Sequence, residues 1–597
     1  MARAALLGGA HPAAAGRRLA RAGDGLSEAP EYPFERPLGA VPCADGVEFR
    51  IWAPRAARAA IRIGTRELPL EPAGYGVWEA RLDCAPGADY VVVLDGRRHP
   101  DPCSRHQPRG LRGPSRVIDT GAFAWRDAGW GGVPLRELVL YELHVGTFTP
   151  EGTFDAVVPH LPALRELGVT AIELMPVGEF PGRRGWGYDC VYGFAAHHAY
   201  GGPAGLQRLV DAAHGHGLGV VLDVVYNHLG ASGVRSFRSF GPYFSDVYET
   251  AWGKAINFDG PGSDAVREWA IQNALFWVRD LHVDGLRLDA THAILDESPR
   301  HVLEELAARV RSARPDALVM AESARNDPRA IRPAEVGGHG ADAVWADDFH
   351  HALTVLLTGE REGYYRDFGS VADLAKAFRR PFVYDGRWSE VRARRVGAPA
   401  GDRPPEQFVV CSQNHDQVGN RALGDRLPAP VRPLAALCTL LSPFTPLLFM
   451  GEEYGEEAPF QYFTGHTDKR LIEATRRGRR REFAAFARFG GHLPDPQDRA
   501  TFERSRLTRR RDAGLERLYR ELLRLRARLP REAAESRFDE AARWLVVRRG
   551  SFELACNFRP EPARVPVEGR ELVLATEATE LSEGELALPA LTGAVLR

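Results

Sequence analysis

Three carboxylate residues stand close behind short apolar segments of the sequence. Asp289 and Glu322 directly follow such segments, and Asp416 lies shortly after another. Arg287 stands two residues before Asp289, so on a strand both side chains point to the same face. A fixed cation beside an acid keeps that acid ionised at neutral pH. One acid can then attack as a nucleophile while another carries a proton. A structural Arg–Asp pair at a strand end is the alternative for this stretch alone.

Imidazole, amide and aromatic residues are expected around the same site. These residues are His228, Asn227, His415, His292, Trp186 and Tyr188. Aromatic rings stack on the apolar face of a pyranose, while carboxylates act on the glycosidic bond. Each residue alone could have a purely structural role, because a lone buried imidazole is more often a core side chain whose hydrogen bonds are all made. We interpret Asp223 as structural, holding a strand end and orienting its neighbours. Taken together, the set predicts a site that holds and cleaves a sugar.

The elements that must position these residues alternate between apolar strands and helices. Strands are expected at 138–144, 171–177, 219–226, 285–289, 317–321, 341–345, 408–411 and 446–450. Near-continuous apolar strands separated by helical periodicity indicate parallel strands buried on both faces. Eight of them predict a closed (β/α)₈ barrel of the α/β class, whose chemistry lies at the carboxyl ends of the strands. No glycine-rich phosphate loop follows the first strand, which argues against a nucleotide-binding fold.

Four regions are expected along the 597 residues. Residues 1–33, rich in Ala, Gly and Arg, are expected to be a disordered extension. Alternating short strands in 34–118 predict an N-terminal β-sandwich, immunoglobulin-like or similar to a carbohydrate-binding module. The barrel and its insertions are placed at 119–530, and a small β-domain at 531–597. The sandwich could bind sugar or form a wall of the neighbouring cleft, and we favour the wall.

Composition narrows the classes of partner. The formal net charge of −2 gives no reason to expect nucleic acid or an anionic membrane, and a neutral substrate fits. No apolar run approaches the length of a membrane span. The seven cysteines are scattered and odd in number, as in a reduced cytoplasmic protein. The sequence has no His-Glu-x-x-His and no EF-hand loop, so we expect no metal and no cofactor.

Four short motifs in this order resemble those of the alpha-amylase superfamily, glycoside hydrolase family 13. They are Asp223-Val-Val-Tyr-Asn-His228, Gly285-Leu-Arg-Leu-Asp289, Ala321-Glu322 and Asn414-His-Asp416. The resemblance covers about residues 138 to 500 and implies a retaining mechanism. It implies that Asp289 is the nucleophile, that Glu322 is the general acid/base, and that Asp416 holds the hydroxyls of a distorted sugar ring.

The resemblance also assigns supporting residues. It implies that Arg287, His228 and His415 surround the sugar that is cleaved, with Tyr188 as the stacking platform. Retention needs the nucleophile and the acid about 5 Å apart. Glu322 must start protonated, so we expect its surroundings to raise its pKa.

Within the superfamily, local segments are similar to the trehalose-releasing branch. Examples are Trp186-Gly-Tyr-Asp-Cys-Val-Tyr192, Gln413-Asn-His-Asp-Gln-Val-Gly-Asn-Arg421 and Pro494-Asp-Pro-Gln-Asp498. The implied reaction is hydrolysis of the α-1,4 bond next to the terminal α,α-trehalose of malto-oligosyltrehalose, an α-glucan chain. The implied metabolic partner is malto-oligosyltrehalose synthase, which makes that terminal linkage. The third residue after the expected nucleophile is His292, where ordinary alpha-amylases carry Lys-His, and this departure points to a different leaving-group site.

Two alternatives stay open. A glycogen or α-glucan branching enzyme shares the sandwich, the barrel and similar motifs, and would form α-1,6 linkages instead of new reducing ends. A catalytically inactive glycan-binding protein is the alternative from another class. Loss of any one of Asp289, Glu322 or Asp416 would favour it, and all three are present.

Overall fold

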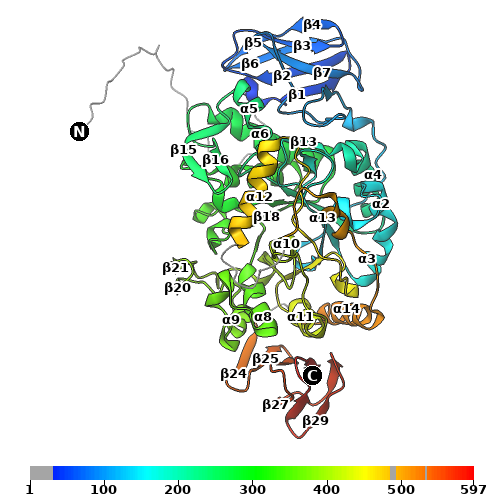
Figure 1. The fold of residues 1–597 in the computed structure, drawn as a ribbon, viewed down its shortest axis with the longest axis vertical. Coiled ribbons are helices and arrows are strands. Elements are labelled where there is room, and N and C mark those ends of the chain that lie inside the picture. Colours follow the sequence, from blue (N-terminus) through cyan, green and yellow to red (C-terminus); the bar gives the residue numbers. More distant parts are fainter. Residues whose placement is uncertain (1–30, 484–492, 531–533) are drawn as a thin grey trace, which may run out of the picture.

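The computed structural model describes residues 31–483, 493–530 and 534–597. Figure 1 shows three layers along the long axis, with a β-rich unit at each end and helices around strands between them. The expected extension therefore lies outside the described residues, apart from 31–33. Among the described residues, none of the helices combines the length and the apolar character needed to span a bilayer.

Two antiparallel sheets form the N-terminal unit. One has the order β1-β2-β6-β5 and the other the order β4-β3-β7-β8, with β9 also paired to β7. Alternate side chains point inward, so Phe49, Ile61 and Val92 form a buried core between the sheets. The strands are β1 (Gly39–Cys43), β2 (Gly46–Trp52), β3 (Ala59–Ile63), β4 (Arg66–Pro69), β5 (Glu71–Gly74), β6 (Val77–Leu82), β7 (Asp89–Leu94), β8 (Arg97–His99) and β9 (Ser115–Arg116).

Eight parallel strands close into a barrel in sequence order, which confirms the predicted fold class. The strands are β10 (Leu140–Leu143), β11 (Ala171–Leu174), β14 (Gly219–Val224), β17 (Gly285–Leu288), β18 (Leu318–Ala321), β19 (Ala343–Trp345), β22 (Phe408–Cys411) and β23 (Thr445–Phe449). Nearly every strand residue is buried, because one face packs into the barrel and the other against helices.

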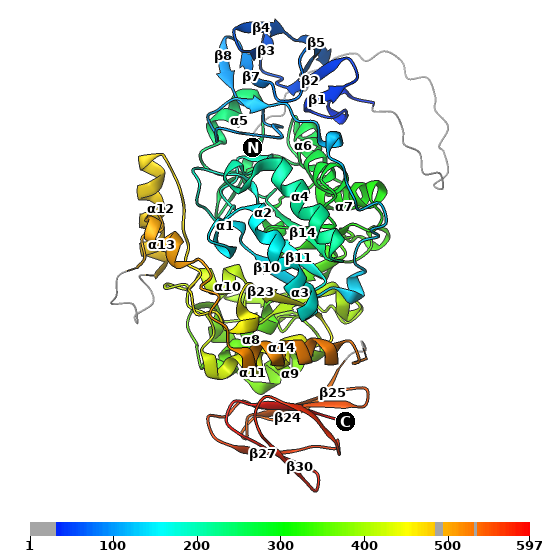
Figure 2. The ribbon, with the colours of Figure 1, turned by 90° about the vertical axis from the view of Figure 1, so that its right-hand side faces the viewer.

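Helices surround the barrel (Figure 2). They are α1 (Val145–Phe148), α2 (Phe154–Val157), α3 (Leu161–Leu167), α4 (Gly202–Gly215), α5 (Val234–Phe240), α6 (Ser263–Leu275), α7 (Val302–Ala313), α8 (Asp347–Thr358), α9 (Val371–Arg379), α10 (His415–Gly419), α11 (Arg432–Leu440), α12 (Lys469–Phe483), α13 (Arg499–Arg504) and α14 (Ala513–Arg526). The fully described connection from β18 to β19 departs from the alternation. It contains two short 3-10 turns, Pro328–Ala330 and Ala334–Val336, in place of a helix.

Within the described residues, three two-stranded hairpins extend from the barrel. They are formed by β12 (Gly178–Glu179) with β13 (Tyr192–Ala196), β15 (Phe244–Thr250) with β16 (Gly253–Ile256), and β20 (Arg387–Ser389) with β21 (Arg394–Val396). The first includes the loop that carries Trp186 and Tyr188. The third lies between β19 and β22, together with α9.

A small β-domain ends the chain. Its strands are β24 (Glu535–Asp539), β25 (Trp544–Arg549), β26 (Phe552–Asn557), β27 (Ala563–Pro566), β28 (Leu572–Ala575), β29 (Glu580–Ser582), β30 (Glu585–Leu588) and β31 (Gly593–Leu596), in sheets of five and three. It packs on the barrel helices α9 and α11 (Figure 1). At this contact the Sγ atoms of buried Cys438 and Cys556 lie 3.8 Å apart.

Candidate active site

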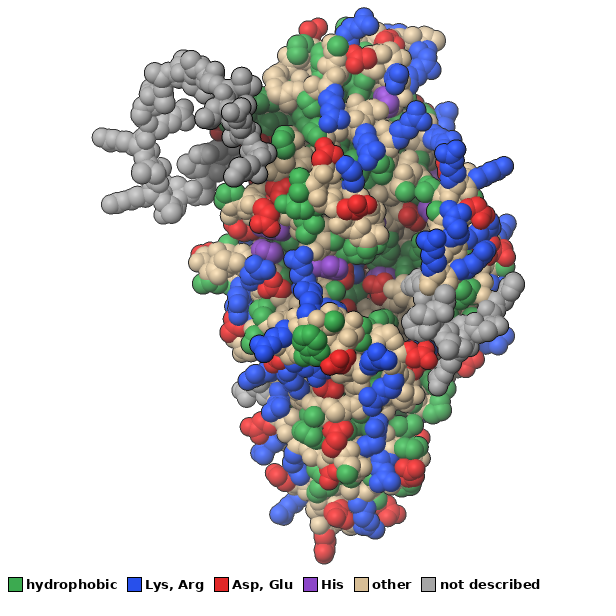
Figure 3. Space-filling model, turned by 60° about the vertical axis from the view of Figure 1, so that its left-hand side comes forward, with side chains coloured by type: hydrophobic (Ala, Val, Ile, Leu, Met, Phe, Trp, Pro, Cys, Tyr) green, Lys and Arg blue, Asp and Glu red, His purple; other side chains and the backbone are tan. Residues whose placement is uncertain are grey.

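The three predicted acids lie at the carboxyl ends of barrel strands. Asp289 follows β17, Glu322 follows β18, and Asp416 is in the first turn of α10, after β22. Arg287 brings two of them together, because its Nη1 lies 2.9 Å from Asp289 Oδ1 and its Nη2 lies 3.6 Å from Glu322 Oε2. The exposed fraction is 40% for the Asp416 side chain and only 12% for that of Asp289. Figure 3 shows a hollow at mid-height of the molecule, edged by histidine, acidic and apolar side chains.

Arg287 is the buried cation beneath these acids. Its side chain has no exposed surface, and its Nη1 also donates to both oxygens of Asp223, at 2.9 and 2.8 Å. The guanidinium carbon lies 4.3 Å from the ring centroid of Trp345 on β19. Parallel pairing of β14 with β17 places Asp223 opposite Arg287. The strand register therefore fixes the cation that faces Asp289.

Glu322 has the properties of a proton donor. Burial raises its pKa, and Asp289, Asp416 and Asp347 add to that effect against the opposing charge of Arg287, so the pKa reaches about 8. Its Oε2 accepts a hydrogen bond from the backbone N–H of Ala290. Ala290 adopts a φ of 39°, in the left-handed region that alanine rarely occupies. The backbone turn after Asp289 therefore directs an amide at the neighbouring acid.

A chain of hydrogen bonds links the other side of the site. His415 Nδ1 lies 2.5 Å from Glu142 Oε1, and its Nε2 lies 2.7 Å from the Tyr188 hydroxyl. That hydroxyl donates to Asp223 Oδ2 at 2.6 Å. Burial alone would lower the pKa of His415, but the Asp416 and Glu142 carboxylates outweigh it and raise the pKa to about 10. His415 is therefore an imidazolium at neutral pH, donating from both nitrogens.

Tyr188 reaches the site because the chain turns sharply before it. Gly187 has a φ of 105°, and a Cβ at that position would lie 2.1 Å from the carbonyl oxygen of Pro176. The Tyr188 ring stacks near His415, with centroids 5.1 Å apart. Trp186, on the other side of the glycine, is buried, and its indole N–H donates to the carbonyl oxygen of Gln461. Trp186 packs edge-on against His415, with ring centroids 5.8 Å apart, and its role in binding sugar stays a prediction.

His228 and Asn227 lie beside the Tyr188 loop. His228 Nδ1 lies 2.9 Å from Asn227 Oδ1, and its Nε2 lies 3.0 Å from the carbonyl oxygen of Tyr188. The ring of Trp252, at the turn between β15 and β16, stacks on His228 with centroids 5.6 Å apart. This indole is 49% exposed. Such an accessible face can hold a pyranose ring.

His292 lies on the Glu322 side. Its Nδ1 is 3.4 Å from the backbone nitrogen of Ala324, and its ring lies edge-on to Trp252, with centroids 6.2 Å apart. Burial lowers the pKa of His292. Arg392, on the turn between β20 and β21, donates to the carbonyl oxygen of Ala324 at 2.7 Å. These residues surround the backbone that follows Glu322.

Sequence reasoning missed four residues of this cluster: Glu142, Trp252, Trp345 and Asp347. Glu142 had a visible signal, since an acid within the apolar segment Leu140–Leu143 needs a buried partner. Trp345 ends an apolar strand like any core residue, and Trp252 lies in a hairpin that was not predicted. Asp347 begins α8, where acids are common for helix capping alone.

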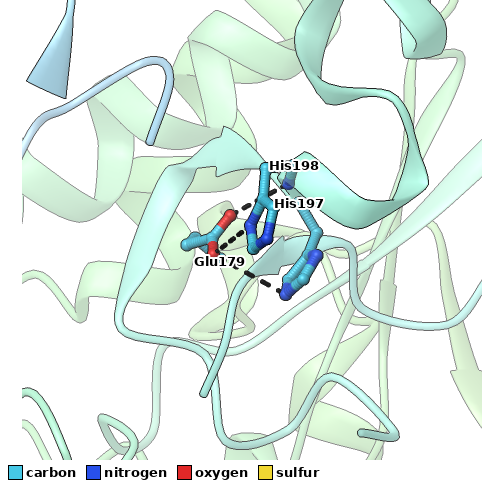
Figure 4. Close-up of side chains that lie close together, drawn as sticks. All are labelled: Glu179, His197 and His198. Atoms are coloured by element: carbon cyan, nitrogen blue, oxygen red, sulfur yellow. Dashed lines mark hydrogen bonds and ion pairs between the residues drawn. The ribbon is translucent and has the colours of Figure 1, made fainter. Parts of the chain in front are cut away.

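Glu179, His197 and His198 form a separate cluster with metal-ligand chemistry (Figure 4). Glu179 Oε1 lies 2.7 Å from His198 Nδ1 and 3.7 Å from His197 Nε2. His197 Nδ1 accepts a hydrogen bond from the backbone N–H of Ala199, so its proton is on Nε2, which faces the carbonyl oxygen of Phe180. In this arrangement His197 has no lone pair left for a cation. The cluster fastens the β12–β13 hairpin.

Comparisons with known proteins agree with this geometry. Residues 114–240 match the family model for the alpha-amylase catalytic domain, and 531–595 match a domain of unknown function. A malto-oligosyltrehalose trehalohydrolase of Rhizobium sp. (strain M-11) is 46% identical over 591 residues, covering 94% of this chain and 99% of the relative. A solved structure from Salmonella typhimurium, described as an alpha amylase, has a TM-score of 0.86 at 39% identity and covers 94% of this chain and 99% of that one.

A branching enzyme is a weaker match. A 1,4-alpha-glucan branching enzyme of Thiobacillus denitrificans is 30% identical over 497 residues, covering 72% of this chain and 63% of that protein. The trehalohydrolase relative matches over almost its whole length and at higher identity. The chain therefore belongs to the family of malto-oligosyltrehalose trehalohydrolases, glycoside hydrolases of the alpha-amylase superfamily.

Proposed function

We propose that this enzyme hydrolyses the α-1,4-glucosidic bond next to the terminal α,α-trehalose of malto-oligosyltrehalose, releasing trehalose and a shortened malto-oligosaccharide. The observation that supports the chemistry best is the pair of acids on adjacent strands. Arg287 contacts both Asp289 and Glu322, while burial raises the pKa of Glu322 to about 8. One acid is thus paired with a fixed cation and the other is protonated at neutral pH, as a retaining glycosidase requires.

In the first step, Asp289 attacks the anomeric carbon while Glu322 gives its proton to the departing glycosidic oxygen. Arg287, held by Asp223 and Trp345, keeps the charge of the nucleophile in place. In the second step, Glu322 takes a proton from water, which attacks the glycosyl–enzyme bond and frees Asp289. We assign Asp416 to the hydroxyls of the distorted sugar.

The remaining residues of the cluster serve binding in this proposal. Tyr188 supplies the stacking face, and its hydroxyl is fixed between His415 and Asp223. The His415 imidazolium and His228 line the sugar site and hold Tyr188 in place, and Asn227 orients His228 through their 2.9 Å contact. Trp186 supports His415 from behind.

We also propose the setting of the reaction. Malto-oligosyltrehalose must come from an enzyme that turns the reducing end of a malto-oligosaccharide into a trehalose linkage, so a synthase of that kind acts before this one. We place the enzyme in the cytoplasm, consistent with seven free cysteines. We also propose that the chain is divided into a β-sandwich at 34–118, a barrel at 119–530 and a β-domain at 531–597.

Product analysis on two substrates of equal length tests the proposal. Maltopentaose and a malto-oligosaccharide of five glucose units ending in trehalose are incubated separately, and products are separated by chromatography. Rapid release of trehalose from the second, with slow attack on the first, is expected. Comparable cleavage of both would indicate a general α-glucanase, and new α-1,6 linkages would indicate a branching enzyme.

A further inference from the structure

Asp347 is a fourth carboxylate at the mouth of the barrel. It follows β19 and begins α8, and its side chain is half-buried. Most of the acids around it accept hydrogen bonds or form ion pairs. Within the described part of the chain, the Asp347 side chain does neither. A carboxylate can accept about four hydrogen bonds. This side chain therefore has its full accepting capacity open to a ligand.

The cations that face Asp347 are already engaged elsewhere. Charged groups on the elements packed around it are Asp416, Glu322, Arg287, His415 and Arg392. Arg287 binds Asp223 and Asp289, and His415 binds Glu142 and Tyr188. Arg392 donates to the carbonyl oxygen of Ala324. Burial raises the pKa of Asp347, the charge of Asp416 adds to it, and the pKa reaches about 6, so the group is mainly ionised at neutral pH.

The position of Glu322 identifies the part of the substrate that Asp347 faces. A general acid must lie against the oxygen of the leaving group. Asp347 and Glu322 follow neighbouring paired strands, β19 and β18, and their carboxylates interact electrostatically. Arg392 and His292 both contact Ala324, two residues beyond Glu322. Asp347 is thus part of the wall that a leaving group touches.

We propose that Asp347 is a specificity-determining residue that accepts hydrogen bonds from hydroxyls of the trehalose leaving group. This inference rests on the proposed function. The second glucose of trehalose is joined through its anomeric carbon, so it presents its hydroxyls in different directions from an α-1,4-linked glucose. A carboxylate in a fixed position at the start of a helix can bind the hydroxyls of one of these two glucose units and not those of the other. Its partner hydroxyls are missing for the wrong leaving group, and that loss lowers the rate for that substrate.

A different role for Asp347 is to raise the pKa of Glu322 by charge alone. That role acts on the chemistry of every substrate, so it changes the pH profile and leaves the preference between substrates unaltered. The hydroxyl-binding role changes the preference. Comparison of two substrates in one variant separates the two roles.

The experiment measures kcat/KM of wild type and Asp347→Asn on the trehalose-ended five-glucose chain and on maltopentaose, from pH 5 to 9. The ratio of the two values is expected to fall at least about tenfold, the size of one lost hydrogen bond to a charged group. An unchanged ratio of the two kcat/KM values overturns the proposal, whether or not the fall of activity at alkaline pH shifts. Wild type without any preference would instead refute the proposed function, so the two failures are distinguishable.

Asp189→Asn is the matched control. Asp189 is also a half-exposed acid near the mouth, and it follows Tyr188 directly in the sequence. Unlike Asp347 it has an ionic partner, because its Oδ2 lies 3.7 Å from His466 Nε2. Its substitution is expected to change both substrates by the same factor. A fall of the preference as large as in Asp347→Asn would overturn the proposal, since loss of any acid of the mouth would then suffice.

Inhibition by free trehalose gives a second measurement. Trehalose competes for the leaving-group position during hydrolysis of a 4-nitrophenyl malto-oligoside. Its inhibition constant is expected to rise at least about tenfold in Asp347→Asn. An inhibition constant equal to that of wild type, in a variant with an unchanged melting curve, would contradict the proposal.

Discussion

The charge of His415 depends on Glu142, and this dependence can be measured. The two side chains are buried and 2.5 Å apart, and the pKa of His415 rises from 6.5 to about 10. Because one pKa unit corresponds to 1.36 kcal/mol, this rise is worth about 5 kcal/mol. Asp416 and Glu142 are the two carboxylates that raise this pKa most. Glu142→Gln keeps the shape and removes the charge, so we expect the pKa of His415 to fall by about 2 units, or about 3 kcal/mol.

The sign of the effect on stability follows from linkage. A histidine whose pKa is raised by folding stabilises the native state fully below pH 6.5, and this stabilisation is lost as the pH rises toward 10. The stability difference between wild type and Glu142→Gln is therefore expected to be largest near pH 6 and to close toward pH 10. Melting temperatures measured across this range test that trend.

The assay for the charge itself is NMR of histidine-labelled protein, with His415→Asn used to assign the signal. Wild-type His415 should remain protonated through pH 9, and in Glu142→Gln it should titrate near pH 8. Activity in the variant should fall at lower pH than in wild type, because Asp416 then loses its cationic neighbour. Titration of wild-type His415 near pH 6.5, or an unaltered pKa in the variant, would refute the reasoning.

Three further outcomes are expected. Asp289→Asn and Glu322→Gln should each abolish turnover with the melting curve preserved, and a near-normal rate in either would remove the assigned roles. The kcat/KM of wild type should fall as the pH rises above about 8, because Glu322 loses the proton it must donate, and a profile flat to pH 9.5 would contradict this. Trp252→Ala should raise KM about fivefold through loss of a stacking face, while Trp252→Phe retains most of the binding; equal KM values in both would exclude stacking.

The barrel could be predicted from the sequence because its strands are buried on both faces. Segments such as Gly219–Val224 and Leu318–Ala321 are almost wholly apolar and follow helical stretches, which leaves few other arrangements. The order of four motifs along the chain then placed three acids at one end of the barrel. The connection after Glu322 escaped prediction, because two 3-10 turns carry no periodic signal.

The supporting residues of the site were harder to predict because they depend on contacts across the fold. Trp186 and Tyr188 are separated only by Gly187, yet one packs behind His415 and the other faces Asp223. The backbone at the glycine decides this difference, and spacing along the sequence does not reveal it. Trp252 meets His228 through an irregular hairpin, whose register shifts between Phe244 and Glu249.

The amide of Ala290 has a consequence for the timing of the reaction. It donates to Glu322 in the resting state, where that acid is protonated and uncharged. Once Glu322 has released its proton, the same amide faces a carboxylate, and a hydrogen bond to a charged acceptor is stronger. The left-handed turn after the nucleophile therefore favours the product of proton transfer over its reactant. It also holds the carboxylate still between the two half-reactions, ready to take a proton from the incoming water.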